Sequence, residues 1–189
     1  MIEKKEVKIR QNIFAFNLAE DIKENDLSFR MVRILARKYI HKYDLIQDAL
    51  YKHLVQTGVI LGVQAKHNLV PTVGRNVLAR LLAGDATYTG EVTHGALGSA
   101  ATPAFTNASA TLTTETYRKA VSSASYSDNI VYIDLYIASG DVADDTYEEF
   151  GYFIDGTGAA DSGQAWSLLR TGGWVKSGSL FVSGQYTIT

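Results

Sequence analysis

The chain has 189 residues, of which 46% are hydrophobic and 11% aromatic, enough to bury a core. Its net charge of -2 does not indicate a polyanionic partner such as nucleic acid. The absence of cysteine excludes disulfides, thiolate zinc sites and cysteine nucleophiles. No run reaches the roughly 18 apolar residues of a membrane span, and the first residues lack the apolar core of a secretion signal. We therefore expect no membrane partner and no signal-directed secretion.

The charge is unevenly distributed along the chain. Residues 1–55 hold 11 Lys/Arg and 8 Asp/Glu, whereas residues 56–189 hold 7 and 12. Opposite net charges attract, so the two parts are expected to contact each other either within one chain or between neighbouring copies.

The first part of the chain is predicted to be a strand followed by helices. Residues 7–18 alternate as in a strand with one drier face. Asp26 is the predicted N-cap of one helix, and Asp44 that of a second helix ending near Thr57, so the two form a hairpin. We interpret residues 1–57 as an assembly or anchoring element. The inward residues are expected to be Leu27, Met31, Ile34, Leu35 and Tyr39 in the first helix and Leu45, Ile46, Ala49, Leu50, His53 and Leu54 in the second.

A basic stripe lies opposite the predicted inward face of the first helix, formed by Arg30, Arg33, Arg37 and His41. It has three interpretations: a phosphate-binding track, a solvated helix face, or an assembly face that meets the acidic part of another copy. Nearby acidic residues dilute the field and no aromatic residue interleaves for base stacking, which disfavours the track. The candidate assembly face comprises Arg30, Arg33 and Arg37.

Residues 68–84 join the helical part to the rest of the chain. A strand at 59–65 leads into this segment, with Val59, Leu61 and Val63 predicted on one side. Pro71 stops the strand, Thr72 is the predicted N-cap of a short helix at 72–83, and Gly84 ends it. The apolar face of this helix is expected to comprise Val73, Val77, Leu78, Leu81 and Leu82.

After residue 90 the sequence consists of short alternating segments separated by turn residues. This spacing predicts a mainly β domain over residues 58–189, an antiparallel β-sandwich of jelly-roll-like type. The last strand is expected to be either central in its sheet or paired with a neighbouring subunit. The predicted strands are 91–98, part of 111–124, 130–137, 147–154, 164–170 and 180–188, with a polar loop at 99–110.

No residue constellation indicates catalysis, and we expect no enzyme, no cofactor and no metal site. The four histidines are scattered, and the acidic loop at 141–149 lacks the spacing of a calcium loop. In the strand at 130–137, Tyr132, Asp134 and Tyr136 share one face. This face is the candidate surface for a host-surface glycan.

Short motifs between residues 59 and 189 follow one another in an order that resembles small virion structural proteins of tailed bacteriophages, loosely described as tail-fibre-like or minor structural proteins. Residues 20–57 depart from the pattern of that group. The motifs are Asn-Leu-Val at 68–70, Gly-Arg-Asn at 74–76, Leu-Leu-Ala-Gly at 81–84, Ala-Leu-Gly at 96–98, Thr102-Pro103, Leu112, Glu115 with Arg118, Glu148–Phe153, Leu168–Arg170, Trp174 and Lys176.

The resemblance implies a non-enzymatic structural component of a virion, made in the host cytoplasm and assembled from copies of itself with other virion proteins. It further implies that Glu115 and Arg118 hold a loop to the sheet as an ion pair. The alternatives are a capsid decoration or cement protein, and a carbohydrate-binding module that recognises the host surface.

Overall fold

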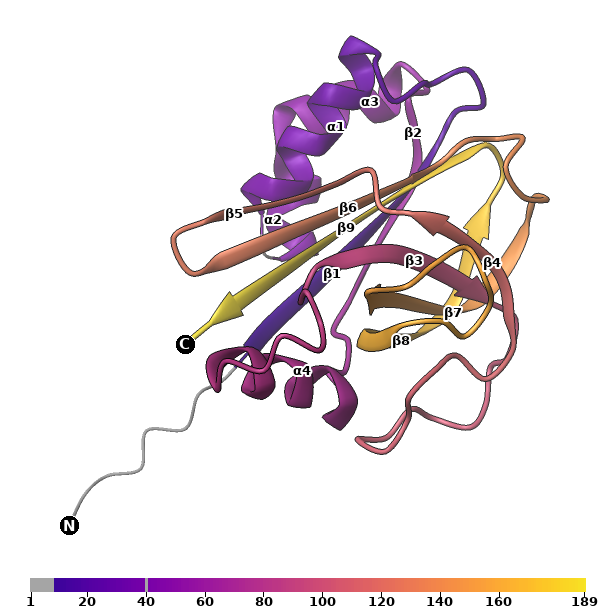
Figure 1. Cartoon of the computed structure of the whole chain (residues 1–189). Helices are drawn as coiled ribbons and strands as arrows, with labels where there is room; N and C mark the ends of the chain where they lie inside the picture. The colour runs from indigo at the N-terminus through magenta and orange to yellow at the C-terminus, as the bar shows by residue number, and fades with distance from the viewer. Residues whose placement is uncertain (1–8, 40) are drawn as a thin grey trace.

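The computed structural model describes residues 9–39 and 41–189 of the chain. Two antiparallel β-sheets pack face to face, and three helices cover the outer face of one of them (Figure 1). The prediction of a mainly β sandwich with an N-terminal helical element is confirmed. Of the strand predicted at 7–18, residues 7 and 8 lie outside the described residues.

The first sheet, sheet A, has five strands in the order β2-β1-β9-β6-β5, and the second, sheet B, has four in the order β4-β3-β7-β8. The strands of sheet A are β1 (Ile9–Leu18), β2 (Ile60–Lys66), β5 (Ser123–Ser127), β6 (Ile130–Ile137) and β9 (Ser179–Ile188). Those of sheet B are β3 (Val92–Gly98), β4 (Glu115–Ala120), β7 (Asp145–Ile154) and β8 (Gln164–Lys176).

The strand β9 lies in the centre of sheet A. It pairs with β1 along its whole length, from Ile9 opposite Ile188 to Leu18 opposite Ser179, and with β6 on its other side. Of the two expectations for this strand, the central position is therefore the one observed. Because β1 is its neighbour, residues 9–18 share one sheet with strands that follow residue 58, and the predicted boundary at 57/58 falls between a helix and β2.

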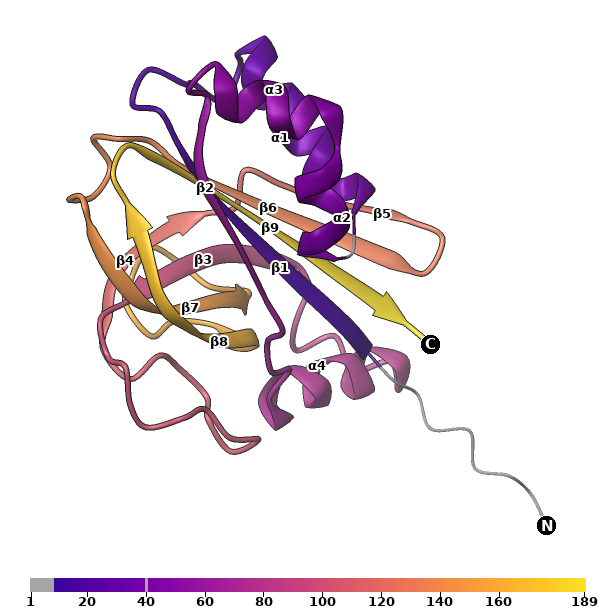
Figure 2. The ribbon, with the colours of Figure 1, turned by 180° about the vertical axis from the view of Figure 1, so that it is seen from behind.

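The helical layer consists of α1 (Leu27–Lys38), α2 (Lys42–Gln47) and α3 (Ala49–Gln56), so the second predicted helix is two helices. The break is at Asp48, whose backbone is extended and whose carboxylate accepts a hydrogen bond from Leu50 N at 2.7 Å. Asp48 rather than Asp44 therefore caps a helix here. Figure 2 shows these helices on one side of sheet A, with sheet B on the other.

Sheet A is buried on both faces, which explains why β1 and β6 have large apolar side chains at successive positions. Ile13, Leu135 and Tyr186 point towards sheet B and belong to the core between the sheets. Phe14 and Tyr136 point the other way, into a second core beneath the helices. A smaller cluster on the outer face of sheet B packs Phe153 and Leu168 under the loop at 99–114 and the fourth helix.

The buried face of α1 differs from the predicted one. Phe29, Val32, Leu35 and Ala36 are buried, whereas Leu27 and Ile34 are 72% and 60% exposed. The ring of Phe29 decides the orientation, because it packs edge-on against Phe181 at 4.8 Å and Tyr136 at 5.1 Å between ring centroids.

The fourth helix, α4 (Thr72–Leu82), closes one end of the sandwich against β8 (Figure 1). Its N-cap is Pro71, not Thr72. Val77 and Gly74 are buried, but Leu82 is 82% exposed, so only part of the predicted apolar face points inward. A Cβ at Gly74 would lie 2.6 Å from the carbonyl oxygen of Ala165, so this glycine allows the helix to approach the strand closely.

The position of β2 corrects one further prediction. In β2, Leu61 is 53% exposed at the edge of sheet A, so Val59, Leu61 and Val63 do not share a buried face. Among the described residues, no helix combines the length and the apolar character needed to cross a membrane.

Candidate functional site

The basic stripe of α1 and the tyrosine face of β6 meet each other in the structure. Asp134 is 1% exposed, and its Oδ2 accepts a hydrogen bond from Arg33 Nε at 2.7 Å and from Arg37 Nη2 at 2.9 Å. The attraction between the basic and acidic parts of the sequence therefore operates at this point within one chain. The two guanidiniums join the helical layer to β6 of sheet A.

Asp134 also accepts hydrogen bonds from its neighbours in the sheet. Ser123 of β5 and Ser183 of β9 lie directly opposite Asp134 on either side. Their hydroxyls donate to Oδ2 at 3.1 Å and to Oδ1 at 2.7 Å. A buried carboxylate with this many charge-assisted partners is a structural clamp.

The prediction of a glycan-binding surface at Tyr132, Asp134 and Tyr136 is wrong, because the helices cover two of these three residues. Asp134 is buried, and Tyr136 is 5% exposed, with its hydroxyl 3.1 Å from Ser179 Oγ and donating to the carbonyl of Ile22. Tyr132 is half-buried, and the guanidinium of Arg37 lies 5.3 Å from its ring centroid. An aromatic face open to a sugar does not exist at this place.

The candidate assembly face is also corrected. Arg33 and Arg37 point to sheet A, where both bind Asp134, and do not form an open basic face with Arg30. Arg30 is exposed. On the solvent side of α1 lies an apolar stripe of Leu27, Met31 and Ile34, in which Met31 is half-buried.

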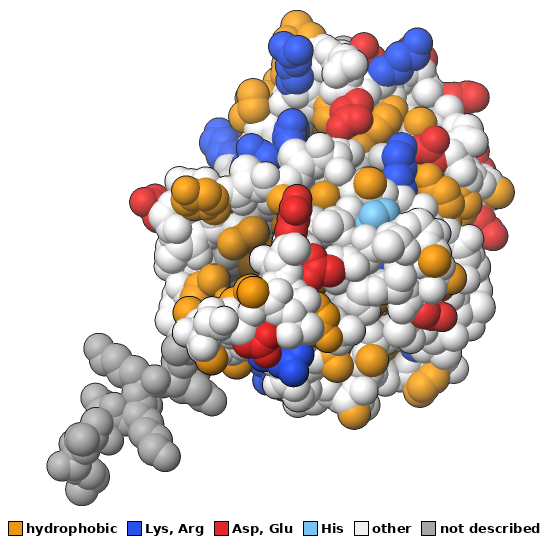
Figure 3. Space-filling model, viewed as in Figure 1, with side chains coloured by type: hydrophobic (Ala, Val, Ile, Leu, Met, Phe, Trp, Pro, Cys, Tyr) orange, Lys and Arg blue, Asp and Glu red, His pale blue; other side chains and the backbone are white. Residues whose placement is uncertain are grey.

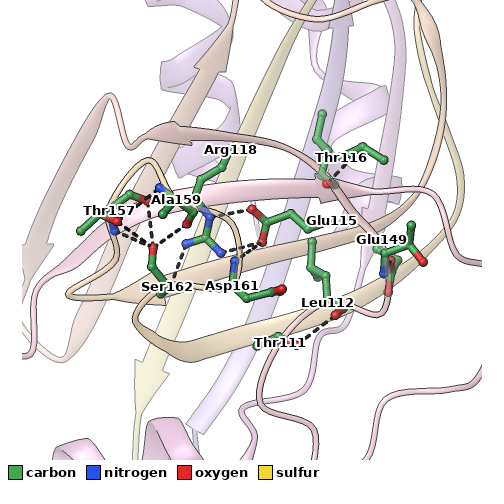
Figure 4. Close-up of polar contacts among 12 residues, drawn as sticks. Thr111, Leu112, Glu115, Thr116, Arg118, Glu149, Thr157, Ala159, Asp161 and Ser162 are labelled. Atoms are coloured by element: carbon green, nitrogen blue, oxygen red, sulfur yellow. Dashed lines mark hydrogen bonds and ion pairs between the residues drawn. The ribbon is translucent and has the colours of Figure 1, made fainter.

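Glu115 and Arg118 form an ion pair on β4 (Figure 4). Arg118 donates from Nε and Nη2 to the two carboxylate oxygens at 2.7 and 2.6 Å, and both side chains are at most 4% exposed. A third donor, Nη1, binds the carbonyl of Ser162 at 2.9 Å in the loop between β7 and β8. The guanidinium also lies 4.1 Å from the ring centroid of Phe153. The pair thus ties this loop to sheet B.

The loop held by Arg118 is stabilised by its own hydroxyl groups. Ser162 Oγ accepts from Thr157 N at 2.8 Å and donates to the carbonyl of Ala159 at 2.7 Å, as Figure 4 shows. Burial, together with the charge of Arg118, lowers the pKa of the adjacent His94. These contacts hold the loop in one conformation. None of them places a proton-accepting side chain beside an unpaired hydroxyl.

A second buried ion pair, between Glu149 and Arg170, was not anticipated. Glu149 of β7 is fully buried, and its Oε1 lies 2.6 Å from Arg170 Nη1 in an ion pair. Its carboxylate accepts hydrogen bonds from the amides of Thr113 and Thr114 at 2.7 and 2.8 Å. Arg170 also donates to the carbonyl of Pro103 at 2.8 Å. The pair fixes the polar loop at 99–114 onto sheet B. The available signal was the acidic pair Glu148-Glu149 directly before the apolar run of β7.

The predicted acidic loop at 141–149 is a loop only up to residue 144, since β7 begins at Asp145, and lysines hold this loop. Lys176 is buried and donates to Asp144 Oδ1 at 2.7 Å and to the carbonyl of Ser139 at 3.2 Å, and Lys119 pairs with Asp141. In the part of the chain that the structure describes, no three His, Asp or Glu side chains form a group that could hold a metal ion.

Comparisons of the chain with protein-family models, with curated proteins and with solved structures found no significant match.

Proposed function

We propose that the protein is a non-enzymatic structural component of a tailed-bacteriophage virion that assembles as a repeated subunit of a tail, neck or fibre. The order of motifs between residues 59 and 189 supports this assignment. The structural observation that carries the assembly role is the apolar stripe of Leu27, Met31 and Ile34 on the solvent side of α1.

This stripe has the spacing of an interface helix. Its three residues are four and three positions apart, so they lie in one row along the helix. Since α1 already buries an opposite face on sheet A, Leu27 and Ile34 stay exposed, and only the half-buried Met31 of this row packs against the edge of the core. Figure 3 shows hydrophobic side chains between Lys and Arg side chains over the helical layer. Contiguous apolar surface rimmed by polar groups is typical of protein interaction sites.

The occupant of this surface is a second copy of the same chain. The helical layer exposes Arg30, Lys42 and Lys52, whereas residues 56–189 carry 12 acidic and only 7 basic side chains. The helical layer of one copy is thus complementary in charge to the sandwich of the next. A contact of this head-to-tail kind closes into a ring or extends into a filament, depending on its rotation.

The assembly is tested by light scattering on fractionated protein over a range of concentrations. The parent chain is expected to form oligomers, and the Leu27→Asp, Ile34→Asp double variant is expected to be monomeric. Leu82→Asp is the matched control, because Leu82 is also an exposed apolar residue of a helix but lies on α4 at the end of the sandwich. A parent that is monomeric at every concentration, or a double variant that assembles normally, contradicts the proposed interface.

The place in the virion is tested by gold labelling of the chain on intact particles viewed by electron microscopy. Label confined to the tail, neck or fibre supports the proposal. Label spread over the head supports the alternative of a capsid decoration protein, with the helical layer as its contact. Particles that carry no label contradict both.

A further inference from the structure

The strand β5 forms one edge of sheet A, and β6 is the only strand that pairs with it among the described residues (Figure 2). At a sheet edge, every second residue of the strand directs its backbone N–H and C=O groups away from the sheet, where another extended chain can bind them. Residues 124–127 of β5 are exposed, and Tyr126 is 82% exposed.

The other three edge strands have protective features that β5 lacks. In β2, exposed Lys66 ends the strand and the register with β1 shifts once; β4 carries Lys119 and also has a register shift. The strand β8 is partly covered, because Leu69 bridges to Leu168, and Gly173 interrupts it with a positive φ. Charges, bulges and coverage are the usual means of keeping an edge unpaired. In contrast, β5 has the sequence Ser-Ala-Ser-Tyr-Ser and an unbroken register with β6, so it is the edge open to strand addition.

An unbalanced positive charge lies beside this edge. Arg33 and Arg37 both pair with Asp134, and within the described part of the chain no other carboxylate forms an ion pair with either guanidinium. Two positive charges thus share one negative charge. Both arginine side chains are 33% exposed, and they donate hydrogen bonds to the hydroxyls of Ser123 and Ser125 on β5. The excess charge therefore lies on the helical side of the open edge.

The two faces of the edge differ in chemistry. Ser123 and Ser125 point to the arginines, whereas Tyr126 lies on the opposite face, across from Val131 of β6. The side chains of an added strand alternate between the same two faces. Carboxylates on its helical face would pair with the guanidiniums, and apolar side chains on its other face would pack beside the ring of Tyr126.

We infer that β5 binds an extended segment of another protein in which acidic side chains alternate with apolar ones. Backbone hydrogen bonds supply affinity, and the carboxylates supply specificity. A second copy of this chain is a poorer occupant, because antiparallel pairing of two β5 strands would bring the positive clusters of Arg33 and Arg37 together on one face. The inference is independent of the virion role and of the interface on α1.

The test is fluorescence polarisation on the full chain with two labelled seven-residue peptides. One alternates valine with aspartate, and the other alternates valine with lysine. Saturable binding of the aspartate peptide is expected at concentrations up to about 1 mM, with binding of the lysine peptide about tenfold weaker or more. No binding of the aspartate peptide, or equal binding of both peptides, overturns the inference.

Backbone methylation of the aspartate peptide separates strand addition from simple charge attraction. Only one edge of an added strand faces β5, so its alternate amides have different surroundings. Two versions of the peptide are prepared, each N-methylated at one of the two alternating sets of amides. One version is expected to lose binding and the other to retain it. Equal affinities of the two methylated peptides overturn strand addition.

Two variants with the same change in net charge test the role of the arginine cluster. Arg37→Met leaves one guanidinium opposite Asp134 and is expected to weaken binding of the aspartate peptide about fivefold or more. Arg30→Met, at an exposed position of the same helix, should bind as the parent does. Melting curves establish that both variants are folded, and the peptide comparisons on the parent chain stay decisive if Arg37→Met is not. Equal affinities of two folded variants overturn the assignment of the charge.

Amide hydrogen exchange locates the peptide. Exchange in β5 is expected to slow when the aspartate peptide is added, whereas exchange in the edge strand β2 stays unchanged. Slowing in β2 instead of β5 overturns the assignment of the site. Slowing in β5 without peptide, as the protein concentration rises, would show that a second copy occupies the edge and would overturn the choice of partner.

Discussion

Arg33 in α1 donates a hydrogen bond from Nε to Oδ2 of Asp134 in β6 at 2.7 Å, across 101 residues of sequence. Together with Arg37, it anchors the helical layer to the outer face of sheet A. The same carboxylate binds serines of β5 and β9, so one side chain links three strands and one helix. Removing its partners should therefore affect the whole fold.

The Arg33→Met, Arg37→Met double variant is expected to lower the free energy of unfolding by about 3–5 kcal/mol, because it leaves the buried carboxylate of Asp134 without a counter-charge. Arg37→Met alone should cost less, since Arg33 remains. Urea unfolding followed by circular dichroism measures both. Arg30→Met on the same helix, where the side chain is exposed, should stay within about 0.5 kcal/mol of the parent. Equal stabilities of the double variant and the Arg30 control would show that the clamp contributes nothing.

The interaction between Lys38 and Asp48 should give the helical layer a pH-dependent stability. Hydrogen bonds from Lys38 Nζ, at 2.8 Å, and from the hydroxyl of Tyr39 lower the pKa of Asp48 well below its usual range. A depressed carboxyl pKa stabilises the fold above the unfolded value of about 3.9, and this contribution is lost as the pH falls from there through the folded pKa.

Asp48→Asn keeps a cap oxygen for Leu50 N but removes the charge. The parent is expected to be slightly more stable than this variant at neutral pH, because Lys38 is more than half exposed and solvent screens the pair. The difference should shrink below about pH 4. Denaturant titrations of both proteins across this range measure it, with Asp44→Asn, an exposed residue of α2, as the control. A difference that persists unchanged in acid would refute the charge effect.

Gly74 and Gly62 should respond in opposite ways to the same added methyl group. At Gly74 a Cβ would lie 2.6 Å from a backbone oxygen of β8, so Gly74→Ala must push α4 away from the sandwich and should cost about 1–3 kcal/mol. At Gly62 nothing lies within 4 Å of the new Cβ, and Gly62→Ala should be neutral or stabilise by up to about 1 kcal/mol. Thermal unfolding of the two variants tests the close approach. Equal changes in melting temperature for the two variants would mean that α4 can move away from β8 without a loss of stability.

Arg170 should control the order of the loop at 99–114. It binds Glu149 and the carbonyl of Pro103, donates to Thr113 Oγ1 at 2.7 Å, and lies 4.1 Å from the ring centroid of Phe105. Arg170→Met is expected to speed amide hydrogen exchange in this loop about tenfold or more, corresponding to the loss of two hydrogen bonds, while exchange in sheet A stays unchanged. Arg75→Met on the exposed face of α4 is the control. Exchange that rises equally across the whole protein would indicate global destabilisation instead.

The strands were predictable from the sequence because their alternation is local. The sequence of residues 130–137 predicts a strand with Ile133 and Leu135 on one side and Tyr136 on the other. In the structure both sides are buried, as expected for apolar and aromatic side chains. The orientation of α1 was not predictable, since its sequence carries two apolar rows. The choice between them depends on where Phe29 meets Phe181 and Tyr136, residues more than 100 positions away.

The buried ion pairs also differ in whether the sequence alone could predict them. Glu115 and Arg118 are three residues apart, so local spacing was enough to anticipate their ion pair. The pairing of Asp134 with Arg33 depends on strand order and on the helical layer lying over β6. Sequence alone placed these two residues on separate candidate surfaces, whereas the fold joins them.

The pairing of β1 with β9 also constrains how the protein is made. The middle of sheet A consists of strands that the ribosome synthesises at opposite ends of residues 9–188. Until β9 emerges, β1 and β6 have no strand between them, and the nascent chain exposes both of their apolar faces. Contacts this distant in sequence slow folding, so the interval between synthesis and burial is the period in which the chain is most exposed to proteases and most dependent on chaperones.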